Sequence, residues 1–239
     1  MKLTILIPMY NEQDILPSTL AQLSSFARER FKSDYELLFV DDGSTDGSAE
    51  IVENFPDEAT RVLRYEKNRG KGCAVRTGML AARGERILFT DCDLAYGTEA
   101  LYDLYACMET QKTADAVVGS RHLHPEGYEG YSFVRRLISR VYRLILRLFF
   151  GLRLSDSQSG LKGFTREAAQ AIFSRCETDR FAFDFEAIMI GKRLGFTFAE
   201  MPAKVICNRP GGKVHLLRDS ARMLRDLFRI SRRVRRMKP

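Results

Sequence analysis

The sequence predicts an α/β protein built on a doubly wound, mostly parallel β-sheet with helices on both faces. Its first half alternates short apolar runs with amphipathic stretches, which is the pattern of successive strand–helix–strand units. The apolar runs are largely continuous, as expected of strands that are buried on both faces. The second half departs from this rhythm, because its helical stretches become long and rich in arginine.

The elements of the first half can be placed in order. Strands are predicted at residues 3–9, 35–40, 61–65, 86–90 and 116–118. Helices are predicted between them, at residues 12–27, 47–54, 71–82 and 98–109. Ligands of such sheets bind at the carboxyl ends of the strands. The residues that follow each strand are therefore the first candidates for a site.

The second half is predicted to hold longer helices and fewer strands. Helices are expected at residues 133–152, 166–174, 183–193 and 215–239, and extended segments at 160–165 and 196–206. Two consecutive glycines, Gly211 and Gly212, predict a turn before the last helix. We expect one domain over residues 1–212, which includes a basic amphipathic helix at about 133–152. A basic amphipathic C-terminal helix over residues 213–239 completes the chain.

The composition excludes several classes of protein. The chain has 239 residues, of which 45% are hydrophobic and 29% charged, so it is neither disordered nor fibrous. The net charge of +7 is concentrated, because residues 217–239 carry +7 by themselves and residues 131–154 contain six arginines and no acid. A mildly acidic body with two cationic segments differs from a uniformly basic nucleic-acid binder, so no nucleic-acid partner is expected.

The cysteine pattern and the length of the apolar runs indicate the cellular compartment of the protein. Five cysteines without CxxC spacing, and an N-terminus without the pattern of a signal peptide, predict a reduced, cytoplasmic protein. Arginines interrupt every apolar run in the segment 133–152, so no stretch reaches the ~20 apolar residues of a membrane-spanning helix. We expect a chain that does not span a bilayer.

Acidic side chains follow two of the predicted strands. Asp41 and Asp42 come directly after one strand, and Asp91 and Asp93 after another. Taken singly, the first pair is also typical of a capped turn, and an Asp-x-Asp spacing alone is weak evidence. Together with the segment 8–12 after the first strand, these stretches are expected to meet in one crevice. Two carboxylates there can hold a divalent cation that bridges a diphosphate.

These stretches resemble the inverting, nucleotide-sugar-dependent glycosyltransferases of family 2, which have a GT-A fold. The resemblance rests on four motifs in order: Ile7–Glu12, Val40–Asp46, Asn68–Gly72 and Asp91–Asp93. Three later stretches resemble the subgroup that acts on polyprenyl or dolichyl phosphate: Gly119–Arg121, Asp156–Phe164 and Phe183–Glu186. The second of these is nearest the dolichyl-phosphate β-glucosyltransferase type. Cys92 departs from the usual small residue, and its thiol is expected to make activity sensitive to oxidants.

The resemblance implies roles for individual residues. The donor nucleotide is expected to contact Pro8, Tyr10, Glu12, Asp42, Asp91 and Lys213. Asp91 and Asp93 are the implied ligands of Mg²⁺ or Mn²⁺. The acceptor phosphate is expected near Arg121, Arg135, Arg136 and Gln158. The implied catalytic residues are Asp93, Arg121 and Asp156. The missing Gln-x-x-Arg-Trp motif argues against the processive cellulose- and chitin-synthase branch, since the chain contains no Trp.

The chemistry fits a phosphate acceptor. Negative charge develops on the leaving nucleoside diphosphate, and a divalent cation with basic side chains stabilises it. An ionised lipid phosphate needs no general base, whereas a hydroxyl acceptor would require Asp184, Glu186 or Asp156 to act as one. His122 and His124 have a conceivable ligand spacing, but surface or packing roles are favoured over metal binding.

Alternatives remain open at this point. Glucose from UDP-glucose is the leading donor, with mannose from GDP-mannose, or a different acceptor, as the enzyme alternatives. A non-enzymatic alternative is an Arg-rich scaffold for membranes or nucleic acids. The acids at the strand ends argue against it, because a scaffold has no use for clustered carboxylates.

The two cationic segments predict amphipathic helices. Arginines recur at helical spacing in both segments: 136, 140, 143 and 147 in the first, and 218, 222, 225, 229, 232 and 236 in the second. They form either solvated faces or contacts with an anionic membrane surface, and the second reading predicts a peripheral enzyme at the cytosolic face. Each basic residue contributes about 1 kcal/mol near an anionic leaflet, so a few suffice for reversible binding. Removing residues 232–239 is expected to weaken this binding in a salt-dependent way.

Overall fold

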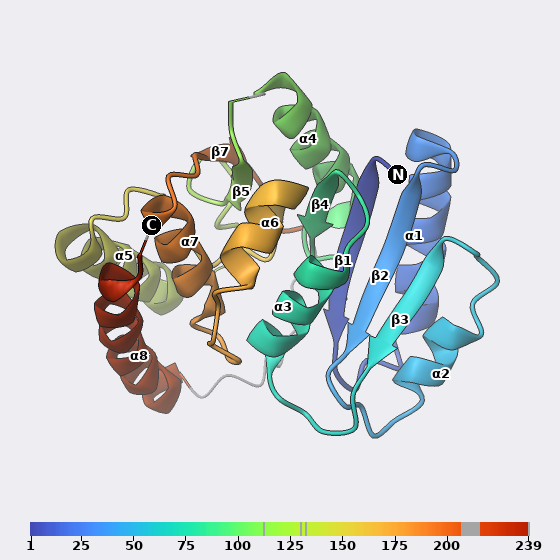
Figure 1. Ribbon diagram of the computed structural model, residues 1–239, viewed down its shortest axis with the longest axis horizontal. Coiled ribbons are helices and arrows are strands. Elements are labelled where there is room, and N and C mark those ends of the chain that lie inside the picture. The colour runs from blue at the N-terminus through green and yellow to red at the C-terminus, as the bar shows by residue number, and fades with distance from the viewer. Residues whose placement is uncertain (112, 130, 132, 207–215, 239) are drawn as a thin grey trace.

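A computed structural model describes residues 1–111, 113–129, 131, 133–206 and 216–238; the side chains of 133–135 and 216–224 are outside this description (Figure 1). In the described residues, seven strands form one sheet in the order β3-β2-β1-β4-β6-β5-β7. The strands are β1 (Leu3–Met9), β2 (Tyr35–Asp41), β3 (Thr60–Arg64), β4 (Arg86–Phe89), β5 (Ala116–Ser120), β6 (Lys162–Thr165) and β7 (Phe198–Pro202). The helices are α1 (Leu16–Phe31), α2 (Ser48–Glu53), α3 (Lys71–Ala81), α4 (Gly97–Thr110), α5 (Phe133–Phe150), α6 (Arg166–Phe173), α7 (Phe183–Arg193) and α8 (Leu216–Arg236).

The sheet is mostly parallel, which confirms the predicted fold class. β1 pairs in parallel with β2 and β4, β3 with β2, and β7 with β5. β6 is the exception, because it lies antiparallel between β4 and β5. β5 therefore runs in the same direction as β1, and its carboxyl end lies at the same edge of the sheet.

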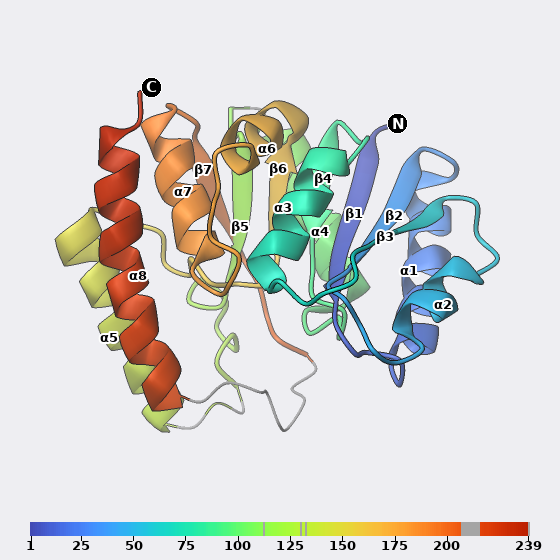
Figure 2. The same cartoon turned by 60° about the horizontal axis from the view of Figure 1, so that its bottom comes forward.

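Hydrophobic side chains divide between the two faces of the sheet. Alternate residues of one strand point to opposite faces, so Leu6 packs in the core under α3, α6 and α7, while Ile5 and Ile7 pack in the core on the side of α1 and α4. Figure 2 shows these two helical layers, with α3, α6 and α7 in front of the sheet. Both faces are thus covered, as the continuous apolar runs predicted.

The two basic helices lie at one end of the molecule, beside α7 (Figures 1 and 2). Phe150 of α5 has its ring centroid 5.0 Å from that of Phe185 and 5.2 Å from that of Phe228 in α8. Leu227, Ile230 and Val234 of α8 are buried in the same core as α7. The last helix is therefore packed on the body of the protein through its apolar face.

The described helices include none that combines the length and the apolar character needed to cross a membrane.

Candidate active site

The loops after β1 and β2 are bound to each other. The side chain of Asn11, which has a positive φ of 53°, accepts a hydrogen bond from the Thr45 amide at 2.8 Å. The Asn11 amide donates to Ser44 Oγ at 2.9 Å, and the Glu12 amide donates to Ser48 Oγ at 2.8 Å. These bonds bring the segment 8–12 beside Asp42, as the sequence predicts.

Asp42 organises the turn that precedes α3. Its carboxylate accepts hydrogen bonds from Asn68 Nδ2 at 2.9 Å and from the amides of Arg69 and Gly70 at 2.9 and 2.8 Å. Burial raises the pKa of Asp42, and the two amide bonds partly oppose this increase. The structure therefore shows this carboxylate holding the segment 68–70, a role that was not predicted.

Asp91 and Asp93 follow β4 at the same edge of the sheet. Phe89 pairs with Leu6, so Asp91 begins the loop beside the carboxyl end of β1. The ammonium group of Lys71, at the start of α3, contacts Asp91 Oδ1. Burial alone would lower the pKa of Lys71, but Asp91 outweighs this effect and raises it. Lys71 has no assigned role in the sequence analysis, although a lysine between two glycines at a helix start is a usable signal for an anion site.

A glycine of the loop before β6, the predicted acceptor loop, touches the same carboxylate. A Cβ atom at Gly160 would lie 2.2 Å from Asp91 Oδ2, so a larger residue here would have to displace the Asp91 carboxylate. The loop before β6 therefore meets the loop after β4 directly. This contact joins the predicted donor side and the predicted acceptor side in one site.

The residues at this point suit a divalent cation. Two carboxylates supply hard oxygen ligands, and the Asp91 carboxylate already contacts one cationic group, the ammonium of Lys71. The described residues contain no cluster of three or more His, Cys, Asp or Glu side chains that could enclose a metal ion.

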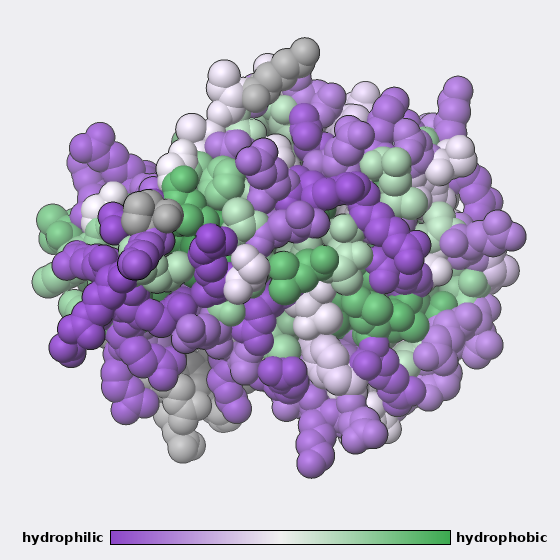
Figure 3. Space-filling view, viewed as in Figure 1, coloured by the Kyte–Doolittle hydropathy of each residue, from purple (hydrophilic) through white to green (hydrophobic). Residues whose placement is uncertain are grey.

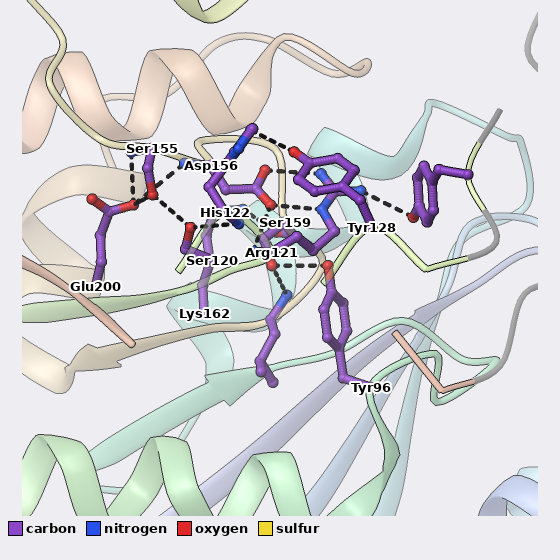
Figure 4. Close-up of polar contacts among 12 residues, drawn as sticks. Tyr96, Ser120, Arg121, His122, Tyr128, Ser155, Asp156, Ser159, Lys162 and Glu200 are labelled. Atoms are coloured by element: carbon purple, nitrogen blue, oxygen red, sulfur yellow. Dashed lines mark hydrogen bonds and ion pairs between the residues drawn. The ribbon is translucent and has the colours of Figure 1, made fainter. Parts of the chain in front are cut away.

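Arg121 and Asp156 form the centre of the predicted acceptor side (Figure 4). Arg121 follows β5, and its Nε and Nη2 atoms donate to the two carboxylate oxygens of Asp156 at 2.6 and 2.8 Å. Nη1 donates to the hydroxyl of Tyr131 at 3.2 Å. Only 15% of the Arg121 side chain and 5% of the Asp156 side chain are exposed. Burial by itself lowers the pKa of Arg121, but the bonds to Asp156 raise it, so the guanidinium stays charged.

Neighbouring elements fix the loop that carries Asp156. The amides of Ser155 and Asp156 donate to Glu200 of β7 at 2.7 and 3.3 Å. Ser159 Oγ donates to the hydroxyl of Tyr96 at 3.1 Å, and Figure 4 shows this pair on the other side of the loop from Glu200. The loop is thus held by β7 on one side and by the segment after Asp93 on the other.

The three acids considered as general bases are all engaged in ion pairs. Asp184 Oδ1 lies 2.7 Å from Lys162 Nζ, Glu186 pairs with an arginine of α8, and Asp156 holds Arg121. Burial raises the pKa of Asp184, although Lys162 acts in the opposite direction. The arrangement therefore favours an acceptor that needs no base.

The other predicted site residues differ in how far they are exposed to solvent. Pro8 is buried near the end of β1, while Tyr10 and Gln158 are exposed at the site and Arg136 is exposed on α5. Lys213 and the side chain of Arg135 lie outside the described residues.

The histidines have local partners. His122 Nε2 shares a hydrogen bond with the Tyr128 hydroxyl, and His124 Nδ1 accepts one from the Glu126 amide at 3.1 Å. Burial and nearby Arg143 lower the pKa of His122. Both imidazoles thus have hydrogen-bond partners close in the chain.

The expectation that Cys92 makes activity oxidant-sensitive is not supported. Cys92 is 5% exposed. Burial, with Glu12 and Asp93 nearby, raises the pKa of its thiol well above the usual value. The thiol stays protonated near neutral pH, and the thiolate is the reactive form.

A family model described as glycosyl transferase family 2 matches residues 4–173. Among curated proteins, the chain is 32% identical to a dolichyl-phosphate beta-glucosyltransferase from Dictyostelium discoideum, over 95% of the chain and 73% of that protein. It is 33% identical to the Saccharomyces cerevisiae protein of the same name, over 94% of the chain and 72% of that protein.

Solved structures share the fold. Glucosyl-3-phosphoglycerate synthase from Mycobacterium tuberculosis, in complex with Mn²⁺, UDP-glucose and phosphoglyceric acid, aligns with a TM-score of 0.73 and 20% identity over 96% of the chain and 79% of that structure. Mannosyl-3-phosphoglycerate synthase from Rubrobacter xylanophilus aligns with a TM-score of 0.73 and 20% identity, over 100% of the chain and 76% of that structure. At this identity, the likeness establishes the architecture and not the substrate.

Proposed function

The chain belongs to glycosyl transferase family 2, and from this membership we propose that it moves glucose from UDP-glucose to a polyprenyl or dolichyl phosphate at the cytosolic face of a membrane. The names of its relatives support this acceptor. The observation that carries the proposal is the contact between the two halves of the site. Gly160, in the loop that carries Asp156, lies against Asp91.

The proposed reaction exchanges one bond for another at C1 of the hexose. The bond from C1 to the diphosphate oxygen breaks, and its electron pair leaves with the nucleoside diphosphate. An oxygen of the lipid phosphate forms the new bond from the opposite face, which inverts the configuration at C1. A phosphate monoester is largely ionised near neutral pH, so no proton has to be removed from it. The ion-paired state of Asp156, Asp184 and Glu186 agrees with this route.

The leaving diphosphate needs positive charge around it. Mg²⁺ or Mn²⁺, when bound, would neutralise charge that develops on the diphosphate, and Asp91 and Asp93 are the residues that would hold it. Lys71 lies at the same carboxylate and is placed to pair with the diphosphate as well. On the acceptor side, Arg121 supplies a permanent positive charge for the incoming phosphate, with Asp156 fixing its orientation.

Helix α5 supports the membrane part of the proposal. Its outward surface carries an apolar row at helical spacing: Leu137, Val141, Leu144 and Leu148, which are 48%, 50%, 54% and 69% exposed. Arg136, Arg140, Arg143 and Arg147 lie along one flank of this row. Figure 3 shows apolar side chains at the left edge of the molecule, where α5 lies. Such a surface suits the interface of an anionic bilayer.

Among its described side chains, helix α8 contributes mainly charge to the outward surface, with Phe228, 53% exposed, as an apolar exception. Its apolar side is buried, and Arg225, Arg229, Arg232 and Arg236 are exposed on the opposite side. We therefore assign insertion into the bilayer interface to α5 and attraction to anionic headgroups to α8. Arg218 and Arg222, which continue the same row in the sequence, have side chains outside the description.

The test is an assay with two labelled donors. UDP-glucose and GDP-mannose are offered separately with Mg²⁺ or Mn²⁺ and a polyprenyl phosphate, and the lipid product is extracted into organic solvent. Label from UDP-glucose is expected in the organic phase. Transfer from GDP-mannose alone would replace the donor, and no transfer from either donor would reject the proposed reaction.

A further inference from the structure

A buried carboxylate connects the last helix to the chain segment beside the donor site. Glu186, in the first turn of α7, is 1% exposed. Its Oε2 atom accepts hydrogen bonds from the amides of Glu177 and Thr178 at 3.0 and 2.8 Å. Its Oε1 atom forms an ion pair with Nη2 of Arg233 in α8. The position of the segment 177–180 therefore depends on a side chain of the C-terminal helix.

Arg233 differs from the arginines around it. Its side chain is 27% exposed, whereas that of Arg229 on the outward row is 72% exposed. Its Nη1 atom donates to the backbone oxygen of Arg175 at 3.1 Å and lies 2.9 Å from Glu177 Oε1. The guanidinium of Arg233 thus contacts Arg175 and Glu177 as well as the buried carboxylate of Glu186.

The segment held in this way packs on the turn that carries Lys71. A Cβ atom at Gly70 would lie 2.4 Å from the backbone oxygen of Asp179, and one at Gly72 would lie 2.4 Å from that of Thr178. The amide of Cys73 donates to the backbone oxygen of Asp179 at 3.2 Å. Two glycines are therefore needed because another backbone passes at contact distance.

The same turn is fixed from its other side by Asp42. That carboxylate accepts bonds from the amides of Arg69 and Gly70, as described above. The turn lies between Asp42 and the segment 177–180, and Lys71 extends from it to Asp91. Releasing either side would allow the Lys71 ammonium group to move relative to the acids of the proposed metal pair.

We propose that Arg233 and Glu186 are positioning residues for the donor site, which hold the turn at residues 70–72 so that Lys71 stays against Asp91. The C-terminal helix is then part of the support of the active site as well as a basic surface. The donor-binding consequence of this inference rests on the proposed function. Its structural consequence, the ordering of residues 70–73 by Arg233, does not.

The experiment compares two neighbouring arginines in the full chain. Arg233→Ala removes the ion pair, and Arg232→Ala removes an equal charge from the exposed side of the same helix turn. Affinity for UDP-glucose with Mg²⁺ is measured by calorimetry. Removing an outer support of a ligand-holding carboxylate costs about 10- to 100-fold in affinity, so Arg233→Ala is expected to weaken binding by that factor and Arg232→Ala by less than about twofold. Arg233→Lys keeps the positive charge but loses the contacts made by two separate guanidinium nitrogens. Its donor affinity should therefore lie between those of Arg233→Ala and Arg232→Ala.

Amide hydrogen exchange gives a second measurement that needs no donor. Arg233→Ala is expected to accelerate exchange at Glu177, Thr178 and Cys73, the amides bonded along this connection. Unchanged exchange at Cys73, or a lower melting temperature with unchanged donor affinity, would overturn the inference. If Arg233→Ala does not fold, Arg233→Lys and Glu186→Gln are judged by the same two measurements. A wild-type chain that binds neither UDP-glucose nor GDP-mannose would reject the proposed function, while the exchange result would still decide this inference.

Discussion

The ammonium group of Lys71 contacts the carboxylate of Asp91, the first acid of the proposed metal pair. Lys71 begins α3 and Asp91 follows β4, so this contact joins the start of a helix to the loop after a strand of the sheet. It places a fixed positive charge where the diphosphate of a donor is expected. A lysine in this place compensates the charge of Asp91, and in the proposed mechanism it would also stabilise the leaving diphosphate.

Replacing Lys71 by Ala is expected to lower kcat/KM for the donor by about 100-fold or more, because one preorganised cationic group is lost. The matched control is Lys67→Ala, which removes an exposed lysine from the same connection. Steady-state assays with varied UDP-glucose measure both variants. Equal kcat/KM values for the two would remove Lys71 from the proposed mechanism.

Asp93→Asn is expected to be nearly inactive, with a loss of about 100-fold or more, because an amide replaces a charged ligand of the cation. Raising Mg²⁺ or Mn²⁺ should recover part of the activity if the loss arises from weaker metal binding. Asp103→Asn on the exposed side of α4 is the control. Full activity of Asp93→Asn at low metal concentration contradicts the metal-bridging role.

Arg121→Ala is expected to destabilise the fold as well as the activity. Removing one partner of a buried ion pair leaves the other charge unpaired, which costs about 3–5 kcal/mol. The control is Arg30→Ala, because Arg30 forms a surface pair with Glu99 at 3.0 Å that is worth about 0–1 kcal/mol. Urea unfolding measures both variants. A similar small loss for the two would show that the bidentate contact with Asp156 adds little stability.

Local patterns in the sequence were sufficient to predict the strands that carry the site. β1, β2 and β4 are largely apolar runs, and the acids at and after their ends are visible without any knowledge of the fold. The convergence of those acids follows from parallel pairing alone. The direction of β6 could not be predicted, because pattern and length do not specify whether a short strand enters a sheet parallel or antiparallel.

Contacts between distant residues account for most of what was not predicted. Arg121 and Asp156 were assigned separately, but their pairing across 35 positions has no signature in either segment. Glu186 was considered only as a base, whereas its partner lies 47 positions away in α8. The role of Lys71 was missed for a different reason. Its glycine neighbours were read as part of a family motif, and their packing against residues 178–180 becomes visible only in three dimensions.

Cys92 gives a prediction about pH. Because the folded protein raises the pKa of this thiol, the folded state keeps the proton at a pH where the unfolded chain, with a thiol pKa of about 8.5, loses it. The contribution to stability is present below pH 8.5 and is lost as the pH rises above it. Iodoacetamide labelling of Cys92 in the native protein is therefore expected to stay slow between pH 7 and 9, by comparison with protein unfolded in urea. Labelling that accelerates near pH 8.5 in the native protein would contradict this protonation state.

The exposed row on α5 leads to a prediction about membrane binding. Leu144→Glu places a charge in the middle of the row, at a side chain that is 54% exposed, so little folding stability should be lost. Burying a leucine side chain contributes about 1.5–3 kcal/mol, and this variant should therefore sediment with anionic vesicles at least about tenfold more weakly. Leu80→Glu, on the exposed side of α3 and 43% exposed, is the matched control and should bind as the wild type does. Salt distinguishes the contribution of the α8 arginines from that of the apolar row on α5. Replacing Arg229 and Arg232 by Gln should remove the part of vesicle binding that weakens as salt is added. Leu144→Glu should instead remove the part of vesicle binding that persists at high salt. Equal sedimentation of the Leu144 and Leu80 variants would show that the row on α5 does not enter the bilayer.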